Sequence, residues 1–127
     1  MRAPTVVTVL AVVAAGVAGF SAPAFADAGK GADSFDSNCA ECHSVAKTLK
    51  NKKGPSLFGV VGRPAGAVPG YDYSPALKAA GIVWTPEKIA AYIASPKKVV
   101  PDGKMKFDGL ADAAERADLI EFLGSQH

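Results

Sequence analysis

Apolar positions recur with helical spacing in two segments, one toward each end of the chain. In residues 28–43, positions 28, 32, 35 and 39 fall on one stripe of a helix. Near the other end, Asp112 precedes a second apolar segment, with Glu115 three residues further on as in a capping box, and Gly124 is placed to end the helix. Its buried face is predicted to hold Leu119, Ile120, Phe122 and Leu123.

Two shorter helices are predicted between these segments. Ser74 and Thr85 are capping residues followed directly by proline, which favours a helix start. The first of these helices ends at Gly81, and the second must stop or kink before Pro96 because the ring removes a donor and restricts the residue before it. Residues 54–75 contain nine Gly or Pro in 22 positions and show no strand alternation. The pattern therefore predicts an all-α domain of four to five short helices and long loops, with a thin core that needs something apolar in its middle.

The first 26 residues differ in composition from the rest. They hold 18 apolar residues, whereas residues 27–127 hold 44 in 101. Arg2 is their only charge, and an apolar stretch from Val6 to Phe20 leads to a small-residue ending at Ala26, which is typical of a secretory signal peptide. A membrane anchor is the alternative, but the unbroken run is shorter than the roughly 20 residues that a bilayer needs. We therefore expect residues 1–26 to be removed, leaving residues 27–127 as one periplasmic domain without membrane insertion.

A single motif carries most of the chemistry. Cys39-Ala40-Glu41-Cys42-His43 is the C-x-x-C-H pattern of covalent c-type haem attachment. Cysteines three apart share a helix face, so each sulfur can form a thioether with one haem vinyl group, and His43, about 100° further round, can ligate the iron. A thioredoxin-like redox pair would need a βαβ frame, and structural zinc would need four ligands where residues 27–127 offer two Cys and two His. Both are poor alternatives.

The second axial ligand of the iron is predicted from the number of methionine and histidine residues in the chain. After cleavage Met105 is the only methionine, and the only histidine besides His43 is His127 at the chain end. The alternative role for Met105 is gap-filling in the core. A thioether ligand favours ferrous iron and raises the reduction potential, and a filled sixth position leaves a substrate nowhere to bind. The pair His43 and Met105 thus predicts outer-sphere transfer of single electrons by haem iron, without enzymatic activity.

Charge is balanced overall and clustered locally. Removing Arg2 with the leader leaves 14 − 1 = 13 Lys+Arg against 12 Asp+Glu, which disfavours a general nucleic-acid binder. Acids gather in the two terminal helical segments, whereas eight lysines follow the C-x-x-C-H motif or flank position 105. Such clusters either steer an acidic docking site on a redox partner or form an ordinary solvated face. The eight are Lys47, Lys50, Lys52, Lys53, Lys97, Lys98, Lys104 and Lys106.

Taken together, residues 29–123 resemble the class I c-type cytochromes, in particular the group of cytochrome c2 and mitochondrial cytochrome c. Besides the C-x-x-C-H motif, the matching segments include 54–59 (GPSLFG), 71–74 (YDYS), 81–84 (GIVW) and 104–107 (KMKF). The resemblance implies the small cytochrome c fold wrapped around one covalently bound haem c. It also implies that Gly31 and Phe35 cross Leu119 and Phe122 where the terminal helices pack.

The resemblance further implies which residues surround the haem. The Pro55 carbonyl would accept a hydrogen bond from His43 and so fix the ring. Asp102-Gly103 departs from the usual Gly-Thr, which removes a hydroxyl expected to bond a haem propionate. The remaining implied positions are Arg63, Tyr73 and Trp84 around the propionates and Tyr92 at the Met105 sulfur.

In function, the resemblance implies a monomeric periplasmic carrier. It would shuttle electrons from a cytochrome bc1-type quinol oxidoreductase to a reaction centre or terminal oxidase, in a respiratory or photosynthetic chain. Two alternatives stay open. A dedicated electron acceptor of a periplasmic dehydrogenase would have the same sequence features, and a haem sensor or peroxidase would require an open sixth position on the iron.

Overall fold

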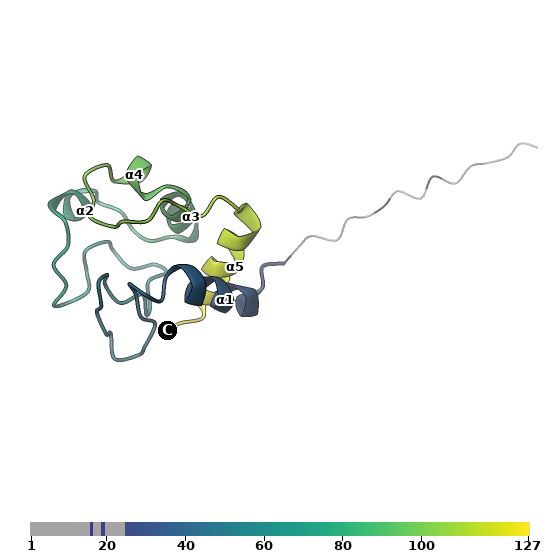
Figure 1. Ribbon diagram of the computed structural model, residues 1–127, viewed down its shortest axis with the longest axis horizontal. Helices are drawn as coiled ribbons and strands as arrows, with labels where there is room; N and C mark the ends of the chain where they lie inside the picture. The colour runs from purple at the N-terminus through teal and green to yellow at the C-terminus, as the bar shows by residue number, and fades with distance from the viewer. Residues whose placement is uncertain (1–15, 17–18, 20–24) are drawn as a thin grey trace, which may run out of the picture.

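The computed structural model describes residues 25–127 together with residues 16 and 19, so most of the expected signal peptide lies outside the described residues. Within the described part the chain forms five helices and no strand, and an isolated bridge pairs Pro64 with Val83. The predicted all-α class is confirmed. None of the described helices is long and apolar enough to cross a bilayer. The helices are α1 (Ala28–Asn38), α2 (Pro75–Ala79), α3 (Pro86–Ala94), α4 (Pro96–Val99) and α5 (Ala113–Gly124) (Figure 1).

Side-chain caps start three of the helices where the sequence predicts them. Ser74 Oγ accepts from the Leu77 amide at 3.1 Å and so caps α2. Thr85 caps α3 in the same way, and the Asp112 carboxylate accepts two amides at the start of α5. Because each cap satisfies amides that have no partner inside the helix, it fixes the first turn.

Two helix ends differ from the predictions. The helix α1 stops at Asn38 and does not continue to His43. The Ala40 amide bonds to the Phe35 carbonyl five residues back, at 2.9 Å, beside the Cys39 amide at 2.8 Å, and this wider bond interrupts the regular helical ladder. At the other boundary, Pro96 ends α3 as expected but also opens the single turn α4. Proline fits the first position of a helix since no amide is needed there.

The terminal helices α1 and α5 pack against each other at close range (Figure 1). A Cβ at Gly31 would overlap the Asp118 carbonyl oxygen and lie 2.7 Å from the Phe122 Cβ, so the crossing needs glycine. Next to it the Phe35 and Phe122 rings are 5.5 Å apart. The implied crossing of the terminal helices is therefore confirmed, and glycine serves close packing here.

A carboxylate extends this helix contact. Glu115 was expected to complete a capping box with Asp112, but its Oε1 instead accepts hydrogen bonds from Ser34 Oγ at 2.8 Å and Asn38 Nδ2 at 3.2 Å, both on α1. These two hydrogen bonds join residues that are 77 or more positions apart in the sequence, so they hold the two terminal helices together. The pair α1 and α5 is thus held by both apolar and polar contacts.

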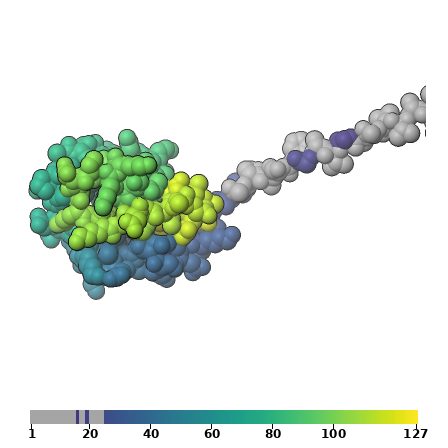
Figure 2. Space-filling model, turned by 45° about the horizontal axis from the view of Figure 1, so that its top comes forward, coloured from purple at the N-terminus to yellow at the C-terminus, as the bar shows by residue number. Residues whose placement is uncertain are grey.

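The core is built around one cluster of buried apolar side chains from α1, α3, α5 and the loops. Leu119, only 2% exposed, is the most buried of these apolar residues. In Figure 2 the segment before α5 crosses between the N-terminal part of the chain and the part that holds α2, α3 and α4. The cluster consists of Phe35, Val60, Trp84, Ile89, Ile93, Leu110, Leu119 and Leu123.

Candidate functional site

A cavity of about 470 Å³ lies among these elements and has the size of a cofactor site. Its wall includes side chains of the apolar core, such as Ile89, Leu119 and Leu123, so the cavity is part of the interior of the fold. Every site residue predicted from the sequence lines it. These residues are Cys39, Cys42, His43, Pro55, Arg63, Tyr73, Trp84, Tyr92 and Met105.

The turn that follows α1 presents the C-x-x-C-H motif to the cavity. The Cys42 and His43 amides both bond to the Cys39 carbonyl, at 3.0 and 2.9 Å, which keeps one tight turn through the motif although the regular helix has ended. Both cysteines carry free thiols and both line the cavity. Burial, with smaller contributions from Cys42 and Glu115, raises the pKa of the Cys39 thiol to about 11. Both cysteines therefore face the same cavity, as their spacing predicts, but they lie on a turn and not on a regular helix.

His43 is held in one orientation. Its side chain is 9% exposed, and Nδ1 donates to the Pro55 carbonyl at 2.7 Å, as the resemblance implies. Burial lowers the pKa of His43 and outweighs the Pro55 carbonyl, which acts to raise it. The imidazole is therefore neutral near pH 7, with the proton on Nδ1 and the lone pair of Nε2 free to bind a metal.

Gly54 is a site residue that the sequence reasoning did not single out. A Cβ at this position would lie 2.8 Å from Nδ1 and 2.9 Å from Nε2 of His43, so the imidazole rests directly on the Gly54 backbone. The Gly54 amide also donates to the Cys42 carbonyl at 2.7 Å. The position of this glycine directly before Pro55 was the signal, since a residue next to the histidine's partner must also lie close to the ring.

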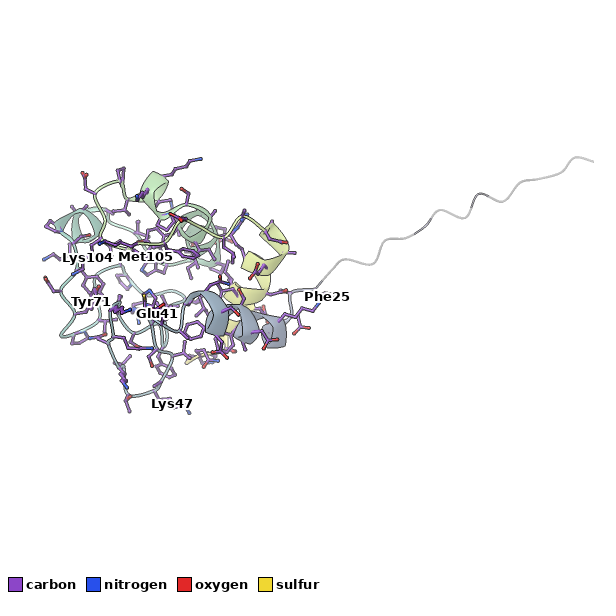
Figure 3. The ribbon with its side chains drawn as sticks, viewed as in Figure 1. Phe25, Glu41, Lys47, Tyr71, Lys104 and Met105 are labelled. Atoms are coloured by element: carbon purple, nitrogen blue, oxygen red, sulfur yellow. The ribbon has the colours of Figure 1, made fainter. Side chains whose placement is uncertain are left out.

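Met105 reaches the cavity from a different part of the chain, the extended segment between α4 and α5. Figure 3 shows Met105 beside Lys104 on this segment, apart from Glu41 in the motif. Tyr92 of α3 also lines the cavity and packs against Trp84, with the ring centroids 4.9 Å apart. Burial raises the pKa of Tyr92, which keeps its phenol protonated and able to donate.

Arg63 brings a positive charge to the cavity wall. Its guanidinium donates to the Ser56 carbonyl at 2.7 Å and to the Phe58 carbonyl at 2.9 Å, so the loop that follows Pro55 closes around it. Burial lowers the pKa of Arg63, yet a guanidinium remains charged at neutral pH. Tyr73, buried beside the same cavity, accepts from the Val68 amide at 3.0 Å.

Two residues that order this loop carried no predicted role. Asn51 accepts from the Ser56 amide at 2.9 Å and donates to the Pro69 carbonyl at 3.0 Å, bridging two parts of the loop. Ser56 is fully buried. Neither residue type is specific to a site, so only the folded contacts identify them.

All eight lysines of the two predicted clusters are exposed, and three of them, at positions 53, 104 and 106, border the cavity. Two are paired with acids that the sequence analysis did not place among them. Lys53 lies 2.6 Å from Glu41, and Lys104 lies 3.8 Å from Asp72 and over the Tyr71 ring. The lysine surface is therefore less uniformly positive than the sequence suggests.

These residues fit a covalently attached haem. Two thiols and an imidazole with a free Nε2 enter an apolar cavity, and a thioether lines the same space. This donor set defines a protein of the c-type haem class.

Comparison with known proteins places the chain within that class. Residues 28–127 match the family model for cytochrome c. The chain is 48% identical over 94 residues to cytochrome c 2.1 of Caenorhabditis briggsae, covering 74% of this chain and 83% of that protein. It is 49% identical over 89 residues to cytochrome c2 of Rhodopila globiformis, covering 70% and 83%. It is 46% identical over 97 residues to cytochrome c of Gibberella zeae, covering 76% of this chain and 92% of that protein.

The chain belongs to the cytochrome c family. As a member of it, the chain binds haem c covalently through Cys39 and Cys42 and carries electrons. The haem iron supplies a one-electron couple, and the protein supplies the attachment, the ligands and the apolar surroundings that set its potential.

Proposed function

We propose that this cytochrome is a periplasmic carrier with His43 and Met105 as axial ligands. It would take electrons from a cytochrome bc1-type quinol oxidoreductase and pass them to a reaction centre or terminal oxidase. The observation that carries the proposal is that one cavity is lined by both thiols, by an imidazole whose Nδ1 is engaged by Pro55, and by the thioether of Met105. With both axial positions taken by protein, the iron changes oxidation state without binding a substrate, and the chain is not an enzyme.

The other cavity residues receive supporting roles in this proposal. Arg63, Tyr73 and Trp84 would meet the haem propionates, because they bring a guanidinium, a phenol and an indole N–H to the cavity wall. Tyr92 would donate to the Met105 sulfur, which is supported by its raised pKa and its place on the same wall. Arg63, Tyr73 and Trp84 would orient the haem through its propionates, and Tyr92 would orient the Met105 side chain.

Export is supported by the sequence of residues 1–26, and we propose cleavage after Ala26. The exposed lysines beside the cavity are proposed to meet acidic docking sites on the redox partners. Contacts of this kind are small and short-lived, which suits a carrier that must leave each partner quickly.

The axial ligand is tested by removing its sulfur. Ferrous wild-type holoprotein is expected to bind carbon monoxide slowly at neutral pH, whereas Met105→Ala should bind it rapidly and show a lower reduction potential. Loss of a thioether ligand removes the donor that favours ferrous iron. The measurements are stopped-flow carbon monoxide binding and redox titration. The matched control is Asp108→Asn, an exposed residue of the same segment that does not border the cavity.

Two results would contradict this assignment. Rapid carbon monoxide binding by the wild-type protein would favour a haem sensor or peroxidase, and an unchanged potential in Met105→Ala would mean that another residue is the ligand. Reduction kinetics with a quinol oxidoreductase and with periplasmic dehydrogenases would separate a general carrier from a dedicated acceptor.

A further inference from the structure

Asp27 makes contacts at the start of α1 that join the two ends of the fold. Its side chain caps the helix, accepting from the Gly29 amide at 2.8 Å and the Lys30 amide at 3.2 Å. Its own backbone nitrogen donates to Asp118 Oδ1 on α5 at 2.7 Å, across 91 residues of sequence. Two residues before it, Phe25 is 88% exposed and projects from the molecule beside α1 (Figure 3).

This arrangement bears on the cleavage proposed above, on which the inference rests. We propose that Asp118 is the binding site for the new α-amino group of the mature chain. Hydrolysis of the Ala26–Asp27 peptide bond by water, catalysed by a signal peptidase, leaves a carboxylate on Ala26 and an ammonium group on Asp27. The nitrogen that already donates to Asp118 then carries a positive charge, and the amide–carboxylate hydrogen bond becomes an ion pair.

The surroundings of this nitrogen explain why a partner is needed. An ammonium at a helix N-terminus is repelled by the positive end of the helix dipole, and two carboxylates, those of Asp27 and Asp118, offset that repulsion. The Asp118 carbonyl lies against Gly31, so the ion pair sits within one turn of the closest approach of α1 and α5. Other charged side chains within one turn of the contact are Lys30 on α1 and Glu115, Arg116 and Glu121 on α5.

The size of the effect follows from exposure. Asp27 is exposed and Asp118 is half-buried, so screening keeps the ion pair modest. An ion partner raises the pKa of the α-amino group in the folded protein above its ordinary value of about 7.7–8.0. The ion pair therefore stabilises the folded protein fully when the pH is below the ordinary pKa of the α-amino group. This stabilisation is lost as the pH rises through the raised pKa of the folded protein.

The test uses the full chain, exported and loaded with haem, in three forms. These are the wild type, Asp118→Asn, and a chain with Gly-Ser inserted between Ala26 and Asp27. The Asn variant keeps an acceptor oxygen but no charge, and the insertion moves the α-amino group two residues away. Intact mass reports the mature N-terminus, and denaturant unfolding at low salt between pH 7 and pH 9.5 reports the ion pair.

We expect a mature wild-type chain that begins at Asp27. Its unfolding constant should rise about fivefold from pH 7 to pH 9.5 relative to Asp118→Asn, and the insertion should behave like Asp118→Asn. A different mature N-terminus would overturn the proposal, and so would the same pH profile in all three forms. The haem absorbance spectrum and potential, measured alongside, should be equal in all three. They report electron-carrier function independently of this ion pair.

Discussion

At the scale of single residues, His43 shows how burial and one hydrogen bond set the state of a ligand. The Pro55 carbonyl accepts the Nδ1 proton, the Gly54 backbone supports the ring, and burial holds the imidazole neutral. These three contacts leave only Nε2 available to a metal. Contacts within the protein alone thus select one tautomer of His43.

The lowered pKa of His43 predicts acid sensitivity. In the folded protein His43 stays neutral, whereas in the unfolded chain it takes up a proton near pH 6.5. Stability is therefore present above that pH and is lost as the pH falls toward the folded value. In the holoprotein, an iron bound at Nε2 would keep His43 neutral as burial does. Denaturant unfolding that releases this ligand between pH 7 and pH 5.5 should show uptake of about one proton per chain at the acid end.

The control for this prediction is His127→Gln, which removes the other histidine of residues 27–127. His127 is exposed at the end of the chain, and its loss should leave the proton uptake nearly unchanged. If the uptake disappeared in this variant, the acid sensitivity would belong to His127 and the role assigned to His43 burial would be wrong.

The residues of the site were predictable to the extent that chemistry limits the choices. A chain with one C-x-x-C-H motif and one internal methionine leaves few options for a haem protein, and all nine predicted residues line the cavity. Asn51 and Ser56 were missed as contributors because Asn51 bonds to backbone groups and Ser56 is buried in the fold, and neither residue type is specific to a site. Gly54 was missed although its position before Pro55 was a signal.

At the scale of elements, helix starts were easier to predict than helix ends. Ser74, Thr85 and Asp112 are capping residues whose side chains act locally, so sequence alone locates α2, α3 and α5. The end of α1 depends on competing bonds at the Phe35 carbonyl, and the partner of Glu115 depends on how α1 meets α5. Tertiary contacts decide both, and they cannot be read from spacing.

The crossing of α1 and α5 predicts a specific cost for a methyl group at position 31. In Gly31→Ala the new Cβ meets the Asp118 carbonyl, a backbone group that moves only with its helix. Overpacking of this kind costs about 2–3 kcal/mol, whereas alanine gains about 1 kcal/mol over glycine within a helix. The net loss in unfolding free energy is expected to be about 1–2 kcal/mol by denaturant titration.

Gly29→Ala is the matched control on the same helix. There a Cβ would lie 3.1 Å from Asp27 Oδ1, the end of a side chain that can adjust. Its stability should equal or slightly exceed that of the wild type. Equal stability of Gly31→Ala and the wild type would show that α5 shifts freely and that the close crossing is not needed.

At the scale of the whole molecule, the cavity joins parts of the chain that are far apart in sequence. The motif after α1, the loop around Arg63, α3, the segment with Met105 and α5 all contribute to its wall. A loss of packing in any of them therefore changes the surroundings of the same cofactor.

The exposed lysines predict salt-dependent partner kinetics. Lys97 and Lys106 are exposed and have no ion pair among the described residues, unlike Lys53 and Lys104. Reversing both to Glu should slow the second-order electron transfer to an acidic partner at least tenfold at low salt. The difference should shrink above 0.1 M, where charges are screened over about 10 Å. Stopped-flow kinetics over a salt series measures this.

Lys30→Glu, which reverses a lysine on α1 that does not border the cavity, is the control. It should change the rate much less than reversal of Lys97 and Lys106. Equal rates for all three proteins would remove the docking role and leave the lysines as a solvated surface.

The placement of Phe25 has a practical consequence. It leaves the body beside α1, whereas Met105 and Lys104 lie toward the other end of the molecule in Figure 3. An electrode linker or a fused oxidoreductase attached ahead of Asp27 would therefore leave the lysine surface open to soluble partners. Such an attachment would replace the α-amino group proposed for Asp27 by an amide. The small stabilisation proposed for its ion pair with Asp118 would then be lost, in exchange for a fixed orientation.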